Sequence, residues 1–209
     1  MQAEQNSHNN EPQLTMTISS KLLTLSLLAV FALASCKKDK EDDDHDHGHN
    51  HNEEELITTV RAFFTHSVTN DVVEFSWRDI DGDGGNAPVI TGGELQPGAT
   101  YTVGLLLLNE SVTPSDTISN EVAAEAAEHQ FFFATTGGSL TWSSYADADS
   151  NGMPIGLAPV WTTTAAGSGN LTIILRHEPN KSAAGVSAGD ITNAGGETDI
   201  EVEIPYTVL

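Results

Sequence analysis

The chain has 209 residues, and its 30 acidic residues against only 8 basic ones give a net charge of −22 at pH 7. A surface this negative repels phosphate backbones and anionic headgroups and attracts cations, which excludes nucleic acid as a partner. The chain has a single cysteine, so it can form no internal disulfide.

The chain begins with a polar leader, residues 1–15, which carries Glu4 and Glu11 and no basic residue. An export signal needs a positive first region, and these acids oppose it. A start at Met16 instead places Lys21 directly before an apolar run. We therefore expect translation to begin at Met16.

The stretch from Lys21 to Cys36 has the character of an export signal. Its thirteen mostly apolar residues, 22–34, are fewer than the roughly 20 that cross a bilayer as a helix. Leu33-Ala34-Ser35-Cys36 resembles the lipobox of bacterial lipoproteins. That resemblance implies removal of residues 1–35 and lipidation of Cys36, which would anchor the protein to a membrane through acyl chains. An uncleaved signal anchor or a core segment is the alternative.

Residues 36–55 form the next segment, KKDKEDDDHDHGHNHNEEE after the cysteine, and contain nothing apolar to bury. We expect a disordered acidic tether. Residues 37–44 resemble the acidic signal that follows the lipidated cysteine in surface-exposed lipoproteins of Bacteroidetes-type bacteria. The resemblance implies the outer face of the outer membrane, and a periplasm-facing location is the alternative.

Four histidines alternate with other polar residues in the centre of this tether. Neutral imidazoles bind Zn, Cu and Ni, and a flexible chain can wrap several of them around one ion. The predicted transition-metal ligands, with Zn as the expected ion, are His45, His47, His49 and His51. The alternative is a hydrophilic spacer without bound metal.

Residues 56–209 form the predicted domain. Asp199, Glu201 and Glu203 alternate with apolar residues, which predicts a strand with one acidic face and one apolar face. The apolar residues are Ile200, Val202, Ile204 and Tyr206. Short runs rich in Val, Ile, Thr and aromatic residues, separated by turn residues, predict seven more strands. We expect an all-β fold, a single antiparallel β-sandwich of immunoglobulin-like architecture. One short connecting helix is predicted over 118–128, capped by Asn120. The other predicted strands are 56–66, 72–78, 100–108, 129–135, 139–145, 159–164 and 171–177.

Two loops, 79–84 and 147–152, follow the D-x-D-x-[DN]-G spacing of calcium-binding loops. Both lack the acidic residue at the twelfth position, and the same residues are also common in hairpin turns. The possible calcium ligands are Asp79, Asp81, Asp83, Asp147, Asp149 and Asn151.

Three histidines of the domain, His66, His129 and His177, fall at predicted strand ends in phase with apolar residues. Such residues are usually packed or lie at the rim of a core, and convergence on one metal ion is the alternative. Gly185 to Gly189 matches the G-x-S-x-G string, but no helix pattern follows it as a nucleophile elbow requires. We therefore predict no catalytic residue and no enzyme.

Several blocks over residues 72–206 resemble a family of small Bacteroidetes-type lipoproteins without an assigned activity. The blocks are SWRDIDGDGG, LQPGATYTVGLLLLNES, EVAAEAAEHQFFF, DADSNGMPIGL and GGETDIEVEIPY. Members are often labelled as type 1 periplasmic-binding-like and are found near outer-membrane receptors. A two-lobed α/β binding protein would need βαβ units, which this chain lacks.

Two functions are consistent with these patterns. The first is a metal-handling lipoprotein whose His-rich tether captures an ion for an outer-membrane transporter. The second is a calcium-stabilised sandwich that binds protein or glycan, with the tether as a spacer.

Overall fold

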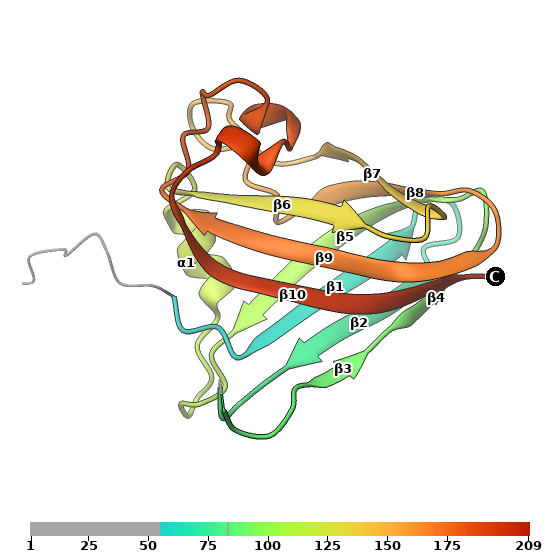
Figure 1. The fold of residues 1–209 in the computed structure, drawn as a ribbon, viewed down its shortest axis with the longest axis horizontal. Coiled ribbons are helices and arrows are strands. Elements are labelled where there is room, and N and C mark those ends of the chain that lie inside the picture. The colour runs from blue at the N-terminus through green and yellow to red at the C-terminus, as the bar shows by residue number, and fades with distance from the viewer. Residues whose placement is uncertain (1–54, 83) are drawn as a thin grey trace, which may run out of the picture. The chain divides into compact units, whose positions relative to one another are not determined.

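The computed structural model describes residues 55–82 and 84–209, which fold into two packed β-sheets (Figure 1). The six-stranded sheet has the order β3-β2-β1-β5-β8-β7, and the four-stranded sheet has the order β4-β10-β9-β6. The all-β sandwich with a short connecting helix, predicted from the sequence, is confirmed.

The six-stranded sheet contains β1 (Thr59–His66), β2 (Val72–Arg78), β3 (Val89–Thr91), β5 (Thr100–Leu108), β7 (Leu140–Tyr145) and β8 (Pro159–Thr163). The four-stranded sheet contains β4 (Gly93–Leu95), β6 (His129–Thr135), β9 (Gly167–His177) and β10 (Glu197–Val208). The helical segments are α1 (Ile118–Ala124) and two 3-10 turns, η1 (Val186–Ala188) and η2 (Ile191–Asn193).

Side-chain alternation along β10 shows why this sequence forms a sandwich. Val202, Ile204 and Tyr206 are buried, whereas Glu201 and Glu203 between them are exposed. Successive residues of a strand point to opposite faces, so this pattern presents one face to the core and one to water. All the pairings of the two sheets are antiparallel except that of β10 with β4.

The main core fills the space between the sheets. Phe64 is fully buried, and its ring centroid lies 4.5 Å from that of Phe75 and 6.1 Å from that of Trp161. Residues of the four-stranded sheet such as Leu175 and Ile204 complete this cluster. Full burial of each such side chain stabilises the fold by roughly 1.5–3 kcal/mol.

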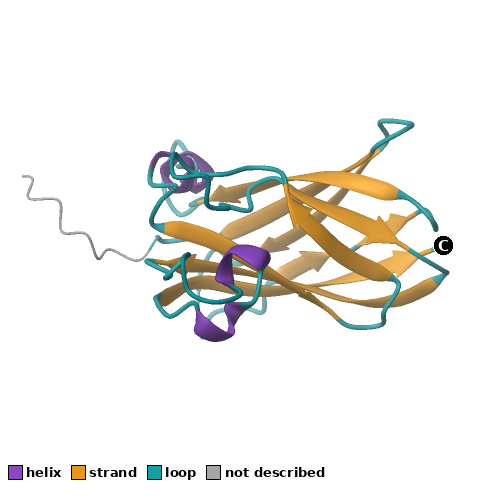
Figure 2. Cartoon of the chain, turned by 90° about the horizontal axis from the view of Figure 1, so that it is seen from above, coloured by secondary structure: helices purple, strands orange, loops and turns teal. Residues whose placement is uncertain are grey.

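A smaller apolar cluster lies on the other face of the four-stranded sheet. Phe132 of β6 packs there with Val186 of η1 and Ala194, which follows η2, so the segment between β9 and β10 covers this face. Figure 2 shows that the helical segments lie toward the end of the sandwich opposite the carboxyl terminus. Among the described residues, no helix has the length and apolar character that a bilayer crossing requires.

The element boundaries differ from the sequence predictions in two respects. The helix ends at Ala124 rather than at residue 128, and its N-cap is Thr117, so Asn120 lies inside it. Strands β3 and β4 were not predicted, because three residues are too few to establish an alternating pattern and the residues of β3 are all exposed. The other strands lie within three residues of their predicted starts, apart from the last two, which are longer.

Candidate metal centre

The register between β6 and β9 brings two of the domain histidines together. His129 begins β6, His177 ends β9, and the two residues are directly paired across the strands. Both side chains are buried, and the rings stack with centroids 4.7 Å apart and planes 15° apart. Two adjacent imidazoles at a strand end can present two nitrogen ligands to one region.

Asp199 joins this pair because β10 carries a bulge. The register with β9 shifts between Thr198 and Ile200, so Asp199 is an extra residue without a partner position in the ladder. Its side chain has no exposed surface. The distances are 3.8 Å from Oδ2 to Nε2 of His129 and 4.0 Å from Oδ1 to Nδ1 of His177. A bulge can redirect a side chain in this way, and here it places a carboxylate between two imidazoles.

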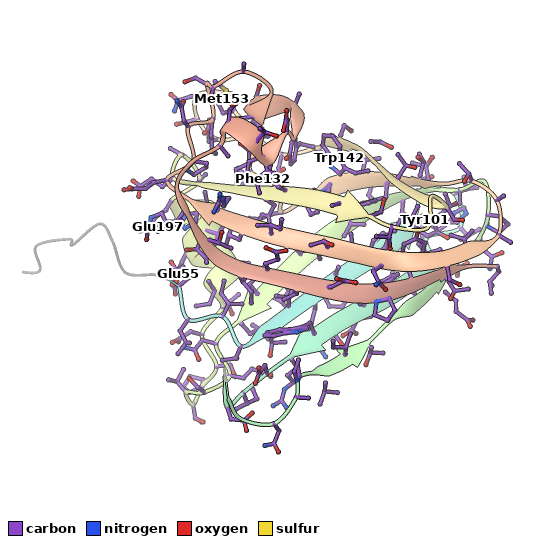
Figure 3. All side chains as sticks on the ribbon, viewed as in Figure 1. Glu55, Tyr101, Phe132, Trp142, Met153 and Glu197 are labelled. Carbon is purple, nitrogen blue, oxygen red and sulfur yellow. The ribbon has the colours of Figure 1, made fainter. Side chains whose placement is uncertain are left out.

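Further carboxylates lie close to His129. Single ligand atoms of Glu55, Glu125 and His129 all lie within 4.8 Å of one another. Burial raises the pKa of Glu55 to about 7, and a hydrogen bond with Glu121 and repulsion from Glu121, Glu125 and Asp199 add to the effect. Negative charges this close favour a proton or a bound cation. Figure 3 shows Glu55 and Glu197 at the same end of the sandwich.

His129 has the protonation state that a metal ligand needs. Burial lowers its pKa, so the imidazole is neutral at pH 7. Nδ1 lies 3.3 Å from the carbonyl oxygen of Glu125, and in the tautomer that donates there Nε2 carries the lone pair. Nε2 is buried and has no hydrogen-bond partner among the described residues. This lone pair faces the Asp199 carboxylate, an arrangement that a shared cation would stabilise.

A second group of possible ligands lies on the His177 side. Ligand atoms of Glu128, His177 and Glu178 lie within 4.8 Å of one another, and Nε2 of His177 is 3.9 Å from Oε2 of Glu128. Glu178 is exposed. His177 and Glu178 also line an open cleft of about 380 Å³ together with Gly196 and Glu197. This side of the cluster is therefore open to solvent.

Glu55 makes the stability of the ion-free protein depend on pH. Its folded pKa of about 7 lies above the usual glutamate value of 4.5, so the folded state holds this proton more tightly than the unfolded state. The stabilisation is complete below pH 4.5 and is lost as the pH rises through 7. After allowance for solvent screening we expect a loss of about 1 kcal/mol between pH 5 and pH 8.

Urea unfolding at both pH values with a chelator present measures this loss. Glu55→Gln should remove most of it, while Glu201→Gln, at an exposed position on β10, should leave it unchanged. Equal pH dependence in all three proteins would contradict the assignment to Glu55.

The carboxylates of the 147–152 loop accept hydrogen bonds from backbone amides. Oδ1 and Oδ2 of Asp147 accept hydrogen bonds from the amides of Gly156 and Ala158. Oδ1 of Asp149 accepts from the amides of Asn151 and Met153. These bonds occupy both carboxylate oxygens of Asp147 and one oxygen of Asp149.

Lys181 supplies a positive charge at the same loop. Its ammonium lies 3.1 Å from Oδ2 of Asp149 and donates to the carbonyl oxygens of Ala126 and Pro154. The side chains of Lys181 and Asp149 are only 6% and 2% exposed, so the ion pair is buried. Burial lowers the pKa of Lys181, and the interaction with Asp149 opposes this shift. Lys181 thus pairs with Asp149, one of the residues predicted to bind calcium. Calcium binding at this loop stays a prediction.

In the 79–84 loop the acids are exposed or half-buried and bond locally. Oδ1 of Asp79 accepts from the amide of Gly82, and Oδ2 of Asp81 accepts from the backbone and side-chain nitrogens of Asn86. These bonds to Asn86 lower the pKa of Asp81. Such contacts are typical of Asx turns. Calcium binding here also stays a prediction, and Asp83 lies outside the described residues.

The remaining predicted residues are distributed as follows. His66 lies outside the cluster, where its ring packs edge-on against Tyr101 and its Nδ1 accepts from the amides of Val68 and Thr69. The serine of the Gly185–Gly189 string, which was not predicted to be catalytic, is Ser187; it lies in the 3-10 turn η1 rather than between a strand and a helix. Cys36, the tether histidines His45, His47, His49 and His51, and the start at Met16 lie outside the described residues.

The fold and this cluster together define an all-β sandwich with an imidazole and carboxylate centre at one end. The chain matches no model of a known protein family, no curated protein and no solved structure. The resemblance to small Bacteroidetes-type lipoproteins therefore stays a prediction.

Proposed function

We propose that this protein is a non-catalytic, lipid-anchored module that captures a divalent transition metal ion, with Zn as the expected ion. In this proposal the ion is held by the folded domain as well as by the His-rich tether. The cargo passes to an outer-membrane transporter from a position at the cell surface. Acylation of Cys36, measured by mass spectrometry of membrane fractions, checks the anchor.

One observation carries the proposal: a buried, neutral histidine is surrounded by carboxylates at the point where the tether enters the domain. Glu55, the first described residue, belongs to the group that includes Glu125 and His129. His51 precedes Glu55 by four residues, so the tether histidine cannot be farther than about 14 Å from it. In this proposal His51 is the tether histidine that shares or transfers an ion with the domain ligands.

The ligand chemistry favours a transition ion over calcium. Zn accepts imidazole nitrogen and carboxylate oxygen at about 2.0–2.2 Å, and four such ligands lie roughly 3.3 Å apart. The atoms of Glu55, Glu125 and His129 are within 4.8 Å of one another, so small side-chain rotations suffice to close around an ion. Calcium prefers six to eight oxygen ligands and gains little from imidazole.

Zinc titration of the purified chain tests the domain site separately from the tether. His45, His47, His49 and His51 are replaced by Asn, and binding is measured by competition with a chromophoric chelator. We expect this tether variant to retain tight Zn binding, and free Zn at 100 times Kd to raise the free energy of unfolding by about 2.7 kcal/mol. Glu125→Gln in the same background should weaken binding at least tenfold, because it removes an exposed ligand without disturbing the core.

The matched control is His66→Ala, which removes an imidazole of the same domain outside the cluster and should leave Zn affinity unchanged. Affinity no tighter than millimolar in the tether variant would refute the domain site. Equal losses with His66→Ala and Glu125→Gln would show that the effect is not specific to the cluster.

A further inference from the structure

We infer that the cluster has two ion positions, an inner one at His129 and an outer one at His177, linked by Asp199. This inference rests on the proposed function, since it assigns a second position to the same metal centre. The inner position is bounded by His129, Glu55 and Glu125, and the outer one by His177, Glu128 and Glu178.

The two ligand groups share no residue. Each contains one imidazole and two carboxylates, and within each group the ligand atoms lie within 4.8 Å of one another. Three such protein ligands, completed by water, are the usual number for an exchangeable Zn site with an open position. The two groups therefore supply ligands for two ions rather than a surplus of ligands for one.

Asp199 connects the two positions through separate oxygen atoms. Oδ2 lies 3.8 Å from Nε2 of His129, which places it to contribute to the inner position. Oδ1 lies 4.0 Å from Nδ1 of His177, whereas Nε2 of the same ring faces Glu128 at 3.9 Å. A carboxylate on one ring nitrogen orients an imidazole whose other nitrogen binds metal. Asp199 is thus placed as an inner ligand, and its Oδ1 is close enough to Nδ1 of His177 that a small side-chain movement would form the orienting hydrogen bond.

The ligands of the two positions are similarly exposed. Each group contains one buried histidine, one half-buried glutamate and one exposed glutamate. The outer position also borders the open cleft that His177 and Glu178 line, whereas the His129 side chain at the inner position has no exposed surface. An ion can therefore reach either position from solvent.

The charge of the cluster supports two cations. Five glutamate and aspartate side chains lie close to the two histidines. One divalent ion would leave a large excess of negative charge at this end of the domain. Two ions bring the local charge closer to balance. These acids are Glu55, Glu125, Glu128, Glu178 and Asp199.

Metal stoichiometry of the chain with the four tether histidines replaced by Asn tests the inference. We expect two Co²⁺ or Zn²⁺ ions per chain by elemental analysis after equilibrium dialysis. Glu128→Gln with Glu178→Gln should remove one ion, Glu125→Gln should remove the other, and the triple substitution should remove both. The control Glu197→Gln lies in the same cleft but outside both ligand groups, and should keep two ions.

The outcomes separate this inference from the proposed function. Zero ions in the tether variant would overturn both. A stoichiometry of one ion per chain, with equal losses of affinity in the Glu125→Gln variant and in the Glu128 and Glu178 variant, would point to a single site. That result would support the proposed function and overturn the second position. Two ions that persist in the Glu128 and Glu178 variant would also overturn the outer assignment. Circular dichroism of each ion-free variant confirms that the fold is retained.

Discussion

Lys181→Met lowers the free energy of unfolding by about 3–5 kcal/mol, the range expected when one partner of a buried ion pair is removed. The substitution keeps the length of the aliphatic chain but leaves the Asp149 carboxylate buried without its cation. The carbonyl oxygens of Ala126 and Pro154 lose a donor at the same time. For a domain of this size the midpoint of thermal unfolding should fall by roughly 8–15 °C.

The double substitution Lys181→Met with Asp149→Asn is the informative comparison. It removes both charges, while the asparagine oxygen can still accept from the amides of Asn151 and Met153. We expect it to recover at least half of the loss, since an isolated buried charge costs more than an absent pair. If Lys181→Met lowered the free energy of unfolding by less than about 1 kcal/mol, the ion pair would not be an important source of stability. Strong rescue of that variant by millimolar calcium would show that the loop binds a cation in place of the lysine.

Gly196→Ala should destabilise the protein by about 2–4 kcal/mol and abolish the outer ion position. Gly196 has φ +68°, and a Cβ atom there would meet the carbonyl oxygen of His177 at 2.1 Å. The start of β10 must then move away from the end of β9, because the atoms that the Cβ would meet belong to the backbone and cannot rotate aside as a flexible side chain can. His177 loses its position relative to Asp199 and Glu128. Urea unfolding and metal stoichiometry measure the two effects.

Gly195→Ala is the matched control for this substitution. Gly195 also has a positive φ, +60°, but a Cβ atom there would meet nothing within 4 Å. Its cost should be limited to the left-handed backbone, about 1 kcal/mol, and both ions should remain. Similar losses in the two variants would show that backbone conformation alone, and not contact with His177, determines the effect.

Much of the fold could be predicted because local patterns in this chain agree with its tertiary structure. The bounds predicted for β2, β5 and β6 are those of the structure, since each strand is rich in β-branched, aromatic or leucine residues and has turn residues nearby. The apolar face of β10 was predicted from Val202, Ile204 and Tyr206 alone. Strand β4 was missed because its three residues pair in parallel with β10, which follows it by about a hundred residues.

The metal centre was harder to predict because it depends on strand pairing. His129 and His177 were correctly placed at strand ends, but their direct pairing requires the register of two strands 48 residues apart in sequence. Asp199 was expected on the exposed acidic face with Glu201, and this was wrong, because the bulge at Thr198 and Ile200 buries its side chain. Glu55 was assigned to the tether, although it belongs to the domain cluster. A histidine at each of two strand ends was the one local signal that could have located the site.

The direction of β10 has a practical consequence for experiments on this protein. Its twelve residues run from Glu197 at the cluster to Val208 at the opposite end of the sandwich, a distance of roughly 35–40 Å. The backbone beyond it is secured by a hydrogen bond from the amide of Leu209 to the carbonyl oxygen of Leu95. A fluorophore or immobilisation handle fused after Leu209 would therefore stand well clear of both histidines. Protein attached to a sensor chip through that handle would keep its ligands open to the flowing solution.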